Sequence, residues 1–329
     1  MLISAVKFAE ADQDGQTKCK FGGNEARLTV DAESLTIAQK IHAFAILVLP
    51  IFGTTGAVLL AIRHGIGRIE IGSLVLMYSV SWIGITVGYH RHFTHRSFKA
   101  VAPVRLMLGV FGSIACQGPV NYWVSNHRRH HQYSDRPGDI HSPYISDGKK
   151  IGLWRGFIHS HVGWTFNHEI TNTAVVAKDI MTDRLVGVVH RLYYLWLILG
   201  FVAPAVLGGI ATQTWEGAML GMLWGGFVRL FLCYHSTNTI TSLTHMFGSR
   251  PFKSHDQSRN NMWLAIPTWG EAWHNNHHSF PTSPIFGLRW WQVDLGGLFI
   301  RFLQVLRLVS AVNKPRPQML ATKARVNAS

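Results

Sequence analysis

The sequence predicts an all-α integral membrane protein with four transmembrane helices arranged in two hairpins. The apolar residues gather into runs long enough to cross a bilayer, and most Lys and Arg residues lie between those runs. Of 329 residues, 47% are apolar and 15% are charged, whereas roughly 25% are charged in an ordinary soluble domain. The 12 Trp, 18 Phe and 8 Tyr exclude a disordered chain. Three isolated cysteines exclude a disulfide scaffold.

Four apolar runs have the length that a bilayer requires, which is about 20 helical residues. Pro50 and Pro204 lie inside runs, and membrane helices tolerate proline where neighbours satisfy the freed backbone groups. Arg229 interrupts the fourth run, and we expect it to face the bundle interior or to snorkel, as a structural residue. The alternative of buried helices in a soluble protein is disfavoured by finding four such runs. We therefore expect spans at about 41–62, 71–89, 193–211 and 218–235.

The distribution of Lys and Arg predicts the orientation of these spans. The segments before the first run, between the second and third, and after the fourth hold five, thirteen and ten such residues. The two hairpin loops hold two and none. The positive-inside rule then places both termini in the cytoplasm, together with segments 90–192 and 236–312. The expected organisation is a cytosolic N-terminal segment (1–40), a membrane domain (41–312) and a C-terminal tail (313–329).

One further stretch is apolar without being a span. Trp290–Val312 mixes Leu, Phe and Val with Asp294, Arg301 and Arg307. It is either an amphipathic helix on the membrane surface or a helix packed on the cytosolic domain. The sequence leaves both open.

Histidines outnumber the acidic residues, 19 against 17. In the pattern HxxHH, which occurs twice, residues at i, i+3 and i+4 share one helical face. His90 and His95 would point about 140° apart on a regular helix, so they converge only if the helix ends or distorts between them. Nine histidines lie in patterned clusters beside the ends of the runs: His90, His95, His127, His130, His131, His245, His274, His277 and His278.

Histidines gathered in this way point to bound metal. Neutral imidazole suits iron, copper, zinc and nickel. Nine ligands would overfill one zinc ion, which takes about four, so two metals sharing the set is the economical interpretation. The alternative is that these are solvated or capping histidines. A metal pair at the mouth of the membrane favours oxidation of an unactivated C–H bond, because a lipid chain can reach it from the bilayer while oxygen and electrons arrive from the cytoplasm.

The boxes HRHFTH, HRRHH and HNNHH, with SLTH between the second and third, resemble those of the membrane-bound stearoyl-type fatty acid desaturases. The resemblance runs from about residue 41 to 294 and includes SDRPGDIHSP and SHVGW. It implies a four-span bundle capped by a cytosolic helical domain that holds a di-iron site. By motif position, one iron would be held by His90, His95, His127, His131 and His278. The other would be held by His130, His245, His274 and His277.

The resemblance also implies a reaction and its partners. A fatty acyl desaturase removes two hydrogens from adjacent methylenes, using O2 and two external electrons. The substrate would be an acyl thioester, on CoA or acyl carrier protein, or a lipid acyl chain. The electron donor would be a ferredoxin or a small cytochrome.

The sequence departs from the family pattern at two places. Thr241 stands where family members commonly have an Asn that holds a water on the second iron, and a hydroxyl can also hold a water. Ser125 and Asn126 stand where animal acyl-CoA members carry Arg-Asp facing the CoA. The second departure weakens the expectation that CoA carries the substrate.

Other functions remain open at this stage. A related di-iron hydroxylase or acetylenase would show the same boxes, and a haem- or metal-binding membrane protein is an alternative of another class. The net charge of +14 follows largely from positive-inside bias, and it also suits an anionic leaflet or an acidic partner. We expect no nucleic-acid partner, because the basic residues are spread along the segments that flank the spans.

Overall fold

The computed structural model describes residues 18–21 and 24–325, so parts of the expected N-terminal segment and C-terminal tail lie outside it. The described chain is mostly helical, in agreement with the predicted fold class. Its α-helices are α1 (Glu33–His64), α2 (Arg68–Trp82), α3 (Ala102–Ile114), α4 (Val120–Tyr133), α5 (Leu153–Ile158), α6 (Trp164–Asn167), α7 (Thr173–Val176), α8 (Lys178–Met181), α9 (Arg184–Arg191), α10 (Tyr193–Thr212), α11 (Trp215–Met222), α12 (Arg229–Thr241), α13 (Leu243–Met246), α14 (Met262–Ala265), α15 (His274–Ser279), α16 (Leu295–Val305) and α17 (Pro317–Lys323). Three π-helical segments interrupt or extend them: η1 (Ile83–Thr94), η2 (His159–Gly163) and η3 (Leu223–Val228).

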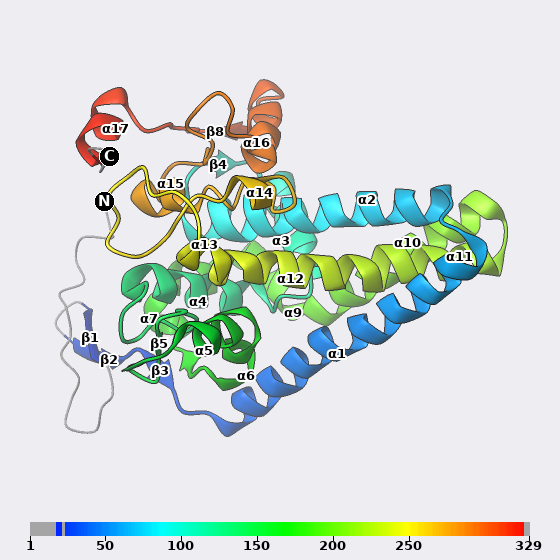
Figure 1. The fold of residues 1–329 in the computed structure, drawn as a ribbon, viewed down its shortest axis with the longest axis horizontal. Coiled ribbons are helices and arrows are strands. Elements are labelled where there is room, and N and C mark those ends of the chain that lie inside the picture. Colours follow the sequence, from blue (N-terminus) through cyan, green and yellow to red (C-terminus); the bar gives the residue numbers. More distant parts are fainter. Residues whose placement is uncertain (1–17, 22–23, 326–329) are drawn as a thin grey trace.

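Within the described residues, four helices are long and apolar enough to cross a membrane: Glu33–His64, Arg68–Thr94, Tyr193–Thr212 and Trp215–Met246. Each contains one of the predicted spans. The first, second and fourth extend well beyond those spans at the ends away from the hairpin turns, because nothing in the backbone requires a helix to stop at the edge of the bilayer. In Figure 1 the long helices lie together at one end of the molecule, and the shorter elements gather at the other end as a cap.

Small residues let the helices of the second hairpin approach closely, as is common in membrane bundles. A Cβ atom at Gly208 would overlap the backbone of Gly217, and one at Gly221 would overlap the carbonyl of Pro204. Arg229 is fully buried in this bundle. Its guanidinium donates to the carbonyls of Ile114 (2.7 Å) and Gly200 (3.0 Å) and to others nearby. The expected structural role, facing the interior, is therefore confirmed.

Short antiparallel ribbons tie the cap together, and no closed sheet forms in the described part of the chain. β3 (Thr29–Val30) pairs with β7 (Ile170–Thr171), and β4 (Lys99–Ala100) pairs with β8 (Val309–Ser310). The remaining pairs join neighbours in sequence: β1 (Lys18–Phe21) with β2 (Asn24–Arg27), and β5 (Ile145–Ser146) with β6 (Lys149–Lys150). The β4–β8 pair holds the segment after the first histidine box against the C-terminal region.

The stretch Trp290–Val312 contains α16, which combines features of both expected arrangements. Ile300 and Leu303 are buried in the main core cluster of the cap, beside Val87 of η1. The other face of the helix exposes Leu298, Phe302 and Val305. The helix is thus packed on the cap and still presents an apolar face outward.

Candidate metal centre

The first histidine box lies on a π-helical segment that aligns His90 and His95. In η1 the hydrogen bonds run from i+5 to i, and the amide of His95 donates to the carbonyl of His90 over 3.1 Å. Residues five apart therefore stack, and the rings of His90 and His95 have centroids 4.9 Å apart. Of the two expectations for this box, distortion is correct, because the helix continues past Tyr89 instead of ending there.

The second and third boxes lie on α4 and α15 and obey a common rule. At about 100° per residue, position i+4 lies about 40° from position i, whereas i+3 lies about 60° away on the other side. The i and i+4 histidines therefore converge. The Nε2 atoms of His127 and His131 are 3.0 Å apart, and the rings of His274 and His278 have centroids 4.3 Å apart. The histidine at i+3 in each box, His130 or His277, turns toward the other group.

All nine predicted histidines come together in two groups, within each of which the ligand atoms lie within 4.8 Å of one another. One group is His90, His95, His127, His131 and His277. The other is His130, His245, His274 and His278.

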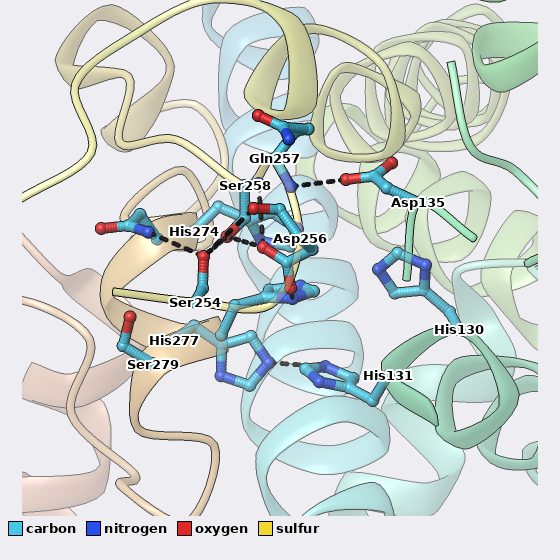
Figure 2. Close-up of polar contacts among 12 residues, drawn as sticks. His130, His131, Asp135, Ser254, Asp256, Gln257, Ser258, His274, His277 and Ser279 are labelled. Atoms are coloured by element: carbon cyan, nitrogen blue, oxygen red, sulfur yellow. Dashed lines mark hydrogen bonds and ion pairs between the residues drawn. The ribbon is translucent and has the colours of Figure 1, made fainter. Parts of the chain in front are cut away.

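The grouping corrects the motif-based expectation at one point, since it exchanges His277 and His278. The Nε2 atom of His277 lies 3.0 Å from that of His90 and 2.9 Å from that of His131. Figure 2 shows the His131–His277 contact between α4 and α15. The physical reason is the rule above: His278, at i+4, must share a group with His274.

Buried carboxylates hold the outward-facing nitrogen of four of these histidines. Each accepts a hydrogen bond from Nδ1: Glu271 from His90, Asp139 from His130 (3.0 Å), Asp135 from His245 (2.8 Å) and Asp256 from His278 (2.5 Å). Such partners fix the tautomer and orientation of a metal-binding imidazole.

The resulting tautomers fit two metal ions. A neutral imidazole carries one N–H, so donation from Nδ1 leaves a lone pair on Nε2. The Nε2 atom of His245 faces that of His274 at 3.1 Å. The buried Nε2 atoms of His95, His130 and His278 have no hydrogen-bond partner among the described residues. Nitrogen lone pairs that converge in a buried site repel one another unless a cation accepts them.

Electrostatics keeps these histidines in the neutral form that a metal ion would require. Burial, reinforced by neighbouring histidines, lowers the pKa of His127, His131 and His277 well below its ordinary value. They are neutral at pH 7. Burial alone would raise the pKa of Asp256, but the partner His278 outweighs it and the pKa lies well below its ordinary value. The carboxylate is therefore ionised while His278 donates to it.

The carboxylates are unequally shared between the groups. In the His130 group, three of the four histidines donate a hydrogen bond to a carboxylate. In the other group, His90 alone does so among the described residues. Sequence analysis missed all four acidic residues. Asp135 and Asp139 lie in the SDRPGD stretch that carries part of the family resemblance, so this stretch was the available signal for two of them.

A buried arginine supports the carboxylate behind His90. Arg91 forms a bidentate ion pair with Asp294 (2.9 and 3.0 Å) and approaches Glu271 at 3.5 Å. Its guanidinium also lies 3.8 Å from the ring centre of Phe286. Asp294 caps the N-terminus of α16 through the amide of Gly297. This network connects the first histidine box to the helix on the outer side of the cap.

The structure shows which groups contact the residues that depart from the family pattern. The Thr241 hydroxyl lies 2.6 Å from the carbonyl of Ser160 and 3.1 Å from that of Asn238, so its proton is directed to the backbone. A water bound there would therefore have to donate a hydrogen bond to the Thr241 oxygen. That Thr241 holds such a water stays a prediction. Ser125 and Asn126 are buried, and Asn126 accepts a hydrogen bond from Thr171 (2.6 Å).

His141, which is not among the nine predicted histidines, also lies beside the site. The ring of His141 is 4.2 Å from that of His130, and with Asp139 these residues form a third cluster that shares His130. Other histidines outside the nine make ordinary polar contacts. His42, for example, contacts the carbonyl of Cys116 at 3.0 Å.

A helical bundle with four membrane-length helices and two buried histidine groups that could each hold a metal ion points to a membrane-associated protein with a candidate metal centre. Residues 70–296 match the family model described as fatty acid desaturase. The chain belongs to the fatty acid desaturase family, whose members are oxidoreductases that act on acyl chains.

Curated relatives match most of this chain. It is 45% identical over 298 residues to a hex-5-enoyl-[acyl-carrier protein] acetylenase of Moorena producens, covering 90% of this chain and 92% of the relative. It is 38% identical to an sn-1 stearoyl-lipid 9-desaturase of Synechocystis, over 77% of this chain and 75% of the relative. It is 35% identical to Delta-9 acyl-lipid desaturase 1 of Arabidopsis thaliana, over 73% and 74% respectively. The similarity therefore extends well beyond the histidine boxes.

Proposed function

We propose that this protein is a fatty acyl desaturase that uses O2 and two electrons at a pair of iron ions. The observation that carries the proposal is the convergence of nine histidines into two groups with their lone pairs turned inward. The irons would be held by His90, His95, His127, His131 and His277, and by His130, His245, His274 and His278. When bound, they supply the oxidation of the C–H bonds.

The overall reaction balances as follows. One –CH2–CH2– unit, one O2, two electrons and two protons give one –CH=CH– unit and two waters. The protein contributes position and a dry environment, since only a chain held in place reacts at one bond. On the spanning side of the site, Trp123 stacks on His127 and packs against a buried cluster that includes Trp82 and Ile85 of the second membrane-length helix. An apolar chain entering from the bundle would meet this surface.

A second candidate is acetylenation, in which an existing double bond loses two further hydrogens. The relative from Moorena producens is named as an acetylenase acting on a carrier-protein-linked chain, and it covers nine-tenths of this sequence. Ser125 and Asn126 are uncharged and buried, which favours a carrier other than CoA. Arg129, which contacts the Thr171 hydroxyl beside Asn126 (3.5 Å), is already paired with Glu169 (3.1 Å).

The same proposal includes the topology. The four long helices would cross the membrane, with both termini and the histidine groups on the cytoplasmic side, because Lys and Arg are concentrated in the cap.

Product mass distinguishes these activities. Iron-loaded protein in lipid nanodiscs is supplied with O2, a chemical reductant and saturated or mono-unsaturated chains on acyl carrier protein, on CoA or in lipid. Desaturation or acetylenation removes two mass units from the chain, and hydroxylation adds sixteen. The His130→Ala variant is the control, because it removes a ligand. The proposal fails if the iron-loaded protein leaves every substrate unchanged.

A further inference from the structure

A half-open groove of about 950 Å³ lies beside the metal centre and is lined by basic side chains. Its basic residues are Arg96, Lys99, Arg301, Lys314 and Arg316, and none of its lining residues is acidic. Aromatic and apolar side chains, among them Phe98, Phe280 and Met319, complete its surface. A mixed basic and apolar surface of this kind suits an acidic protein better than a free small anion.

Much of the positive charge in the groove is uncompensated. Arg96 pairs with Asp179, but that carboxylate also binds Arg128, so the three groups together keep one positive charge. Arg301 and Lys314 form no ion pair within the described residues. Burial and the nearby Arg301 lower the pKa of Lys314, which is the effect of like charges held close together. An acidic partner would relieve this repulsion.

Two walls of the groove continue directly from metal ligands. Arg96 follows His95 in the chain, so their Cα atoms are about 3.8 Å apart. Phe280 follows His278 by two residues, a separation of at most about 7 Å. The third wall is the segment from Ala311 to Met319, which leads into α17. α17 is held on α15 by Lys323, whose ammonium donates to the carbonyl of Ser279 (2.5 Å). Short stretches of the chain thus link the groove, which lies at the protein surface, to one histidine of each group.

The position of the groove separates it from the route of an acyl chain. α17 lies at the end of the molecule remote from the turns that join the long helices (Figure 1). A soluble protein can reach this end, whereas an apolar chain is expected at the bundle side, where Trp123 covers His127.

We propose that this groove is the docking surface for the electron donor, a small acidic iron–sulfur protein of the ferredoxin type. The inference rests on the proposed function, since that reaction requires two electrons from outside the chain. Charge complementarity would steer the donor and set its orientation. The short chain links from the groove to His95 and His278 would then connect the docked donor to the metals.

The test measures binding and needs no turnover, so its outcome is independent of whether an acyl product forms. A purified acidic [2Fe–2S] ferredoxin is titrated onto the iron-loaded full-length protein in phosphatidylcholine nanodiscs. The groove variant is Lys314→Glu/Arg316→Glu. The matched control is Lys149→Glu/Lys150→Glu, which makes the same change of charge at exposed residues of β6. Its hairpin partner β5 lies on the opposite side of the cap from α17 (Figure 1).

We expect the groove variant to weaken ferredoxin binding about tenfold, from the loss and reversal of two exposed charges, and the control to change it less than about twofold. Binding by the unmodified protein should also weaken as ionic strength rises from about 0.01 M to about 0.15 M, where the screening length falls from about 30 Å to about 8 Å. This salt titration needs no variant and so does not depend on how the variants fold. The proposal would be overturned if the two variants had equal effects or if ferredoxin binding were insensitive to salt. It would also be overturned if the groove variant weakened the binding of acyl carrier protein and left the binding of ferredoxin unchanged.

Discussion

The carboxylates behind the histidines make a sharp prediction about metal affinity, and Asp256 is the best place to test it. Asp256→Asn keeps the size of the side chain but removes the charge that accepts the Nδ1–H of His278 at 2.5 Å. Both side chains are buried, with exposed fractions of 7% and 1%. The hydroxyl and amide of Ser258 also donate to this carboxylate. The substitution therefore changes a buried site directly behind His278.

The expected loss can be worked out in two ways. A hydrogen bond to a charged group contributes about 1.5–3 kcal/mol. Partners of metal-binding histidines typically contribute a factor of about 10–100 in affinity, or about 1.4–2.8 kcal/mol. The two ranges agree. Because His278 belongs to the group with His130, we expect the loss to fall on one metal and to spare the other.

The assay is a chelator competition on iron-loaded protein in detergent, followed by metal analysis. Asp256→Asn should fall toward one iron per chain at a chelator concentration that leaves the unmodified protein with two. Glu169→Gln is the matched control, since this carboxylate is 67% exposed and pairs with Arg129. Equal retention of iron by Asp256→Asn and the control would refute the reasoning, and so would simultaneous loss of both metals.

Three further predictions follow from the packing and charges. Burial lowers the pKa of His168 to about 4, below its unfolded value of about 6.5, so the unfolded state binds the proton first and stability falls as pH drops below 6.5. In chemical denaturation, the stability lost between pH 7 and pH 5 should be about 2 kcal/mol smaller in His168→Gln than in the unmodified protein, and parallel curves would contradict this. Gly84→Ala should destabilise by about 1–3 kcal/mol in thermal unfolding, because its Cβ would overlap the backbone of α3. Gly56→Ala, which meets nothing within 4 Å, should be neutral or stabilising, and similar melting shifts would be inconsistent with the packing. Finally, His278→Ala should remove the same iron as His130→Ala, and His277→Ala should remove the other iron. Mössbauer spectra of the iron that remains would show which one was lost. If His277→Ala instead removed the same iron as His130→Ala, the motif-based assignment would be correct.

The spans and the nine histidines could be predicted from sequence because both signals are local. A run of about 20 apolar residues is long enough to cross a bilayer whatever packs around it. The spacing HxxHH places three imidazoles on one face of any helix. Helix geometry alone pairs i with i+4 in both boxes, so the spacing that places His131 with His127 also places His278 with His274.

The first box marks the limit of such local reasoning. The spacing of His90 and His95 required a broken or distorted helix, and it did not say which. The π-helical segment became visible only in the structure, where η1 packs against α3 through Gly84 and Gly88. A close approach of two backbones depends on both helices.

By itself the sequence determined the class of the fold, the concentration of Lys and Arg outside the hairpin loops, the nine metal-binding candidates and the family. The tertiary structure decided how the histidines divide between two sites, which carboxylates stand behind them and where a basic groove meets them. Asp135 lies 110 residues from His245, and Glu271 lies 181 residues from His90. No periodicity or motif spacing connects residues so far apart, because their contact depends on how α4, α13, α15 and η1 pack against one another.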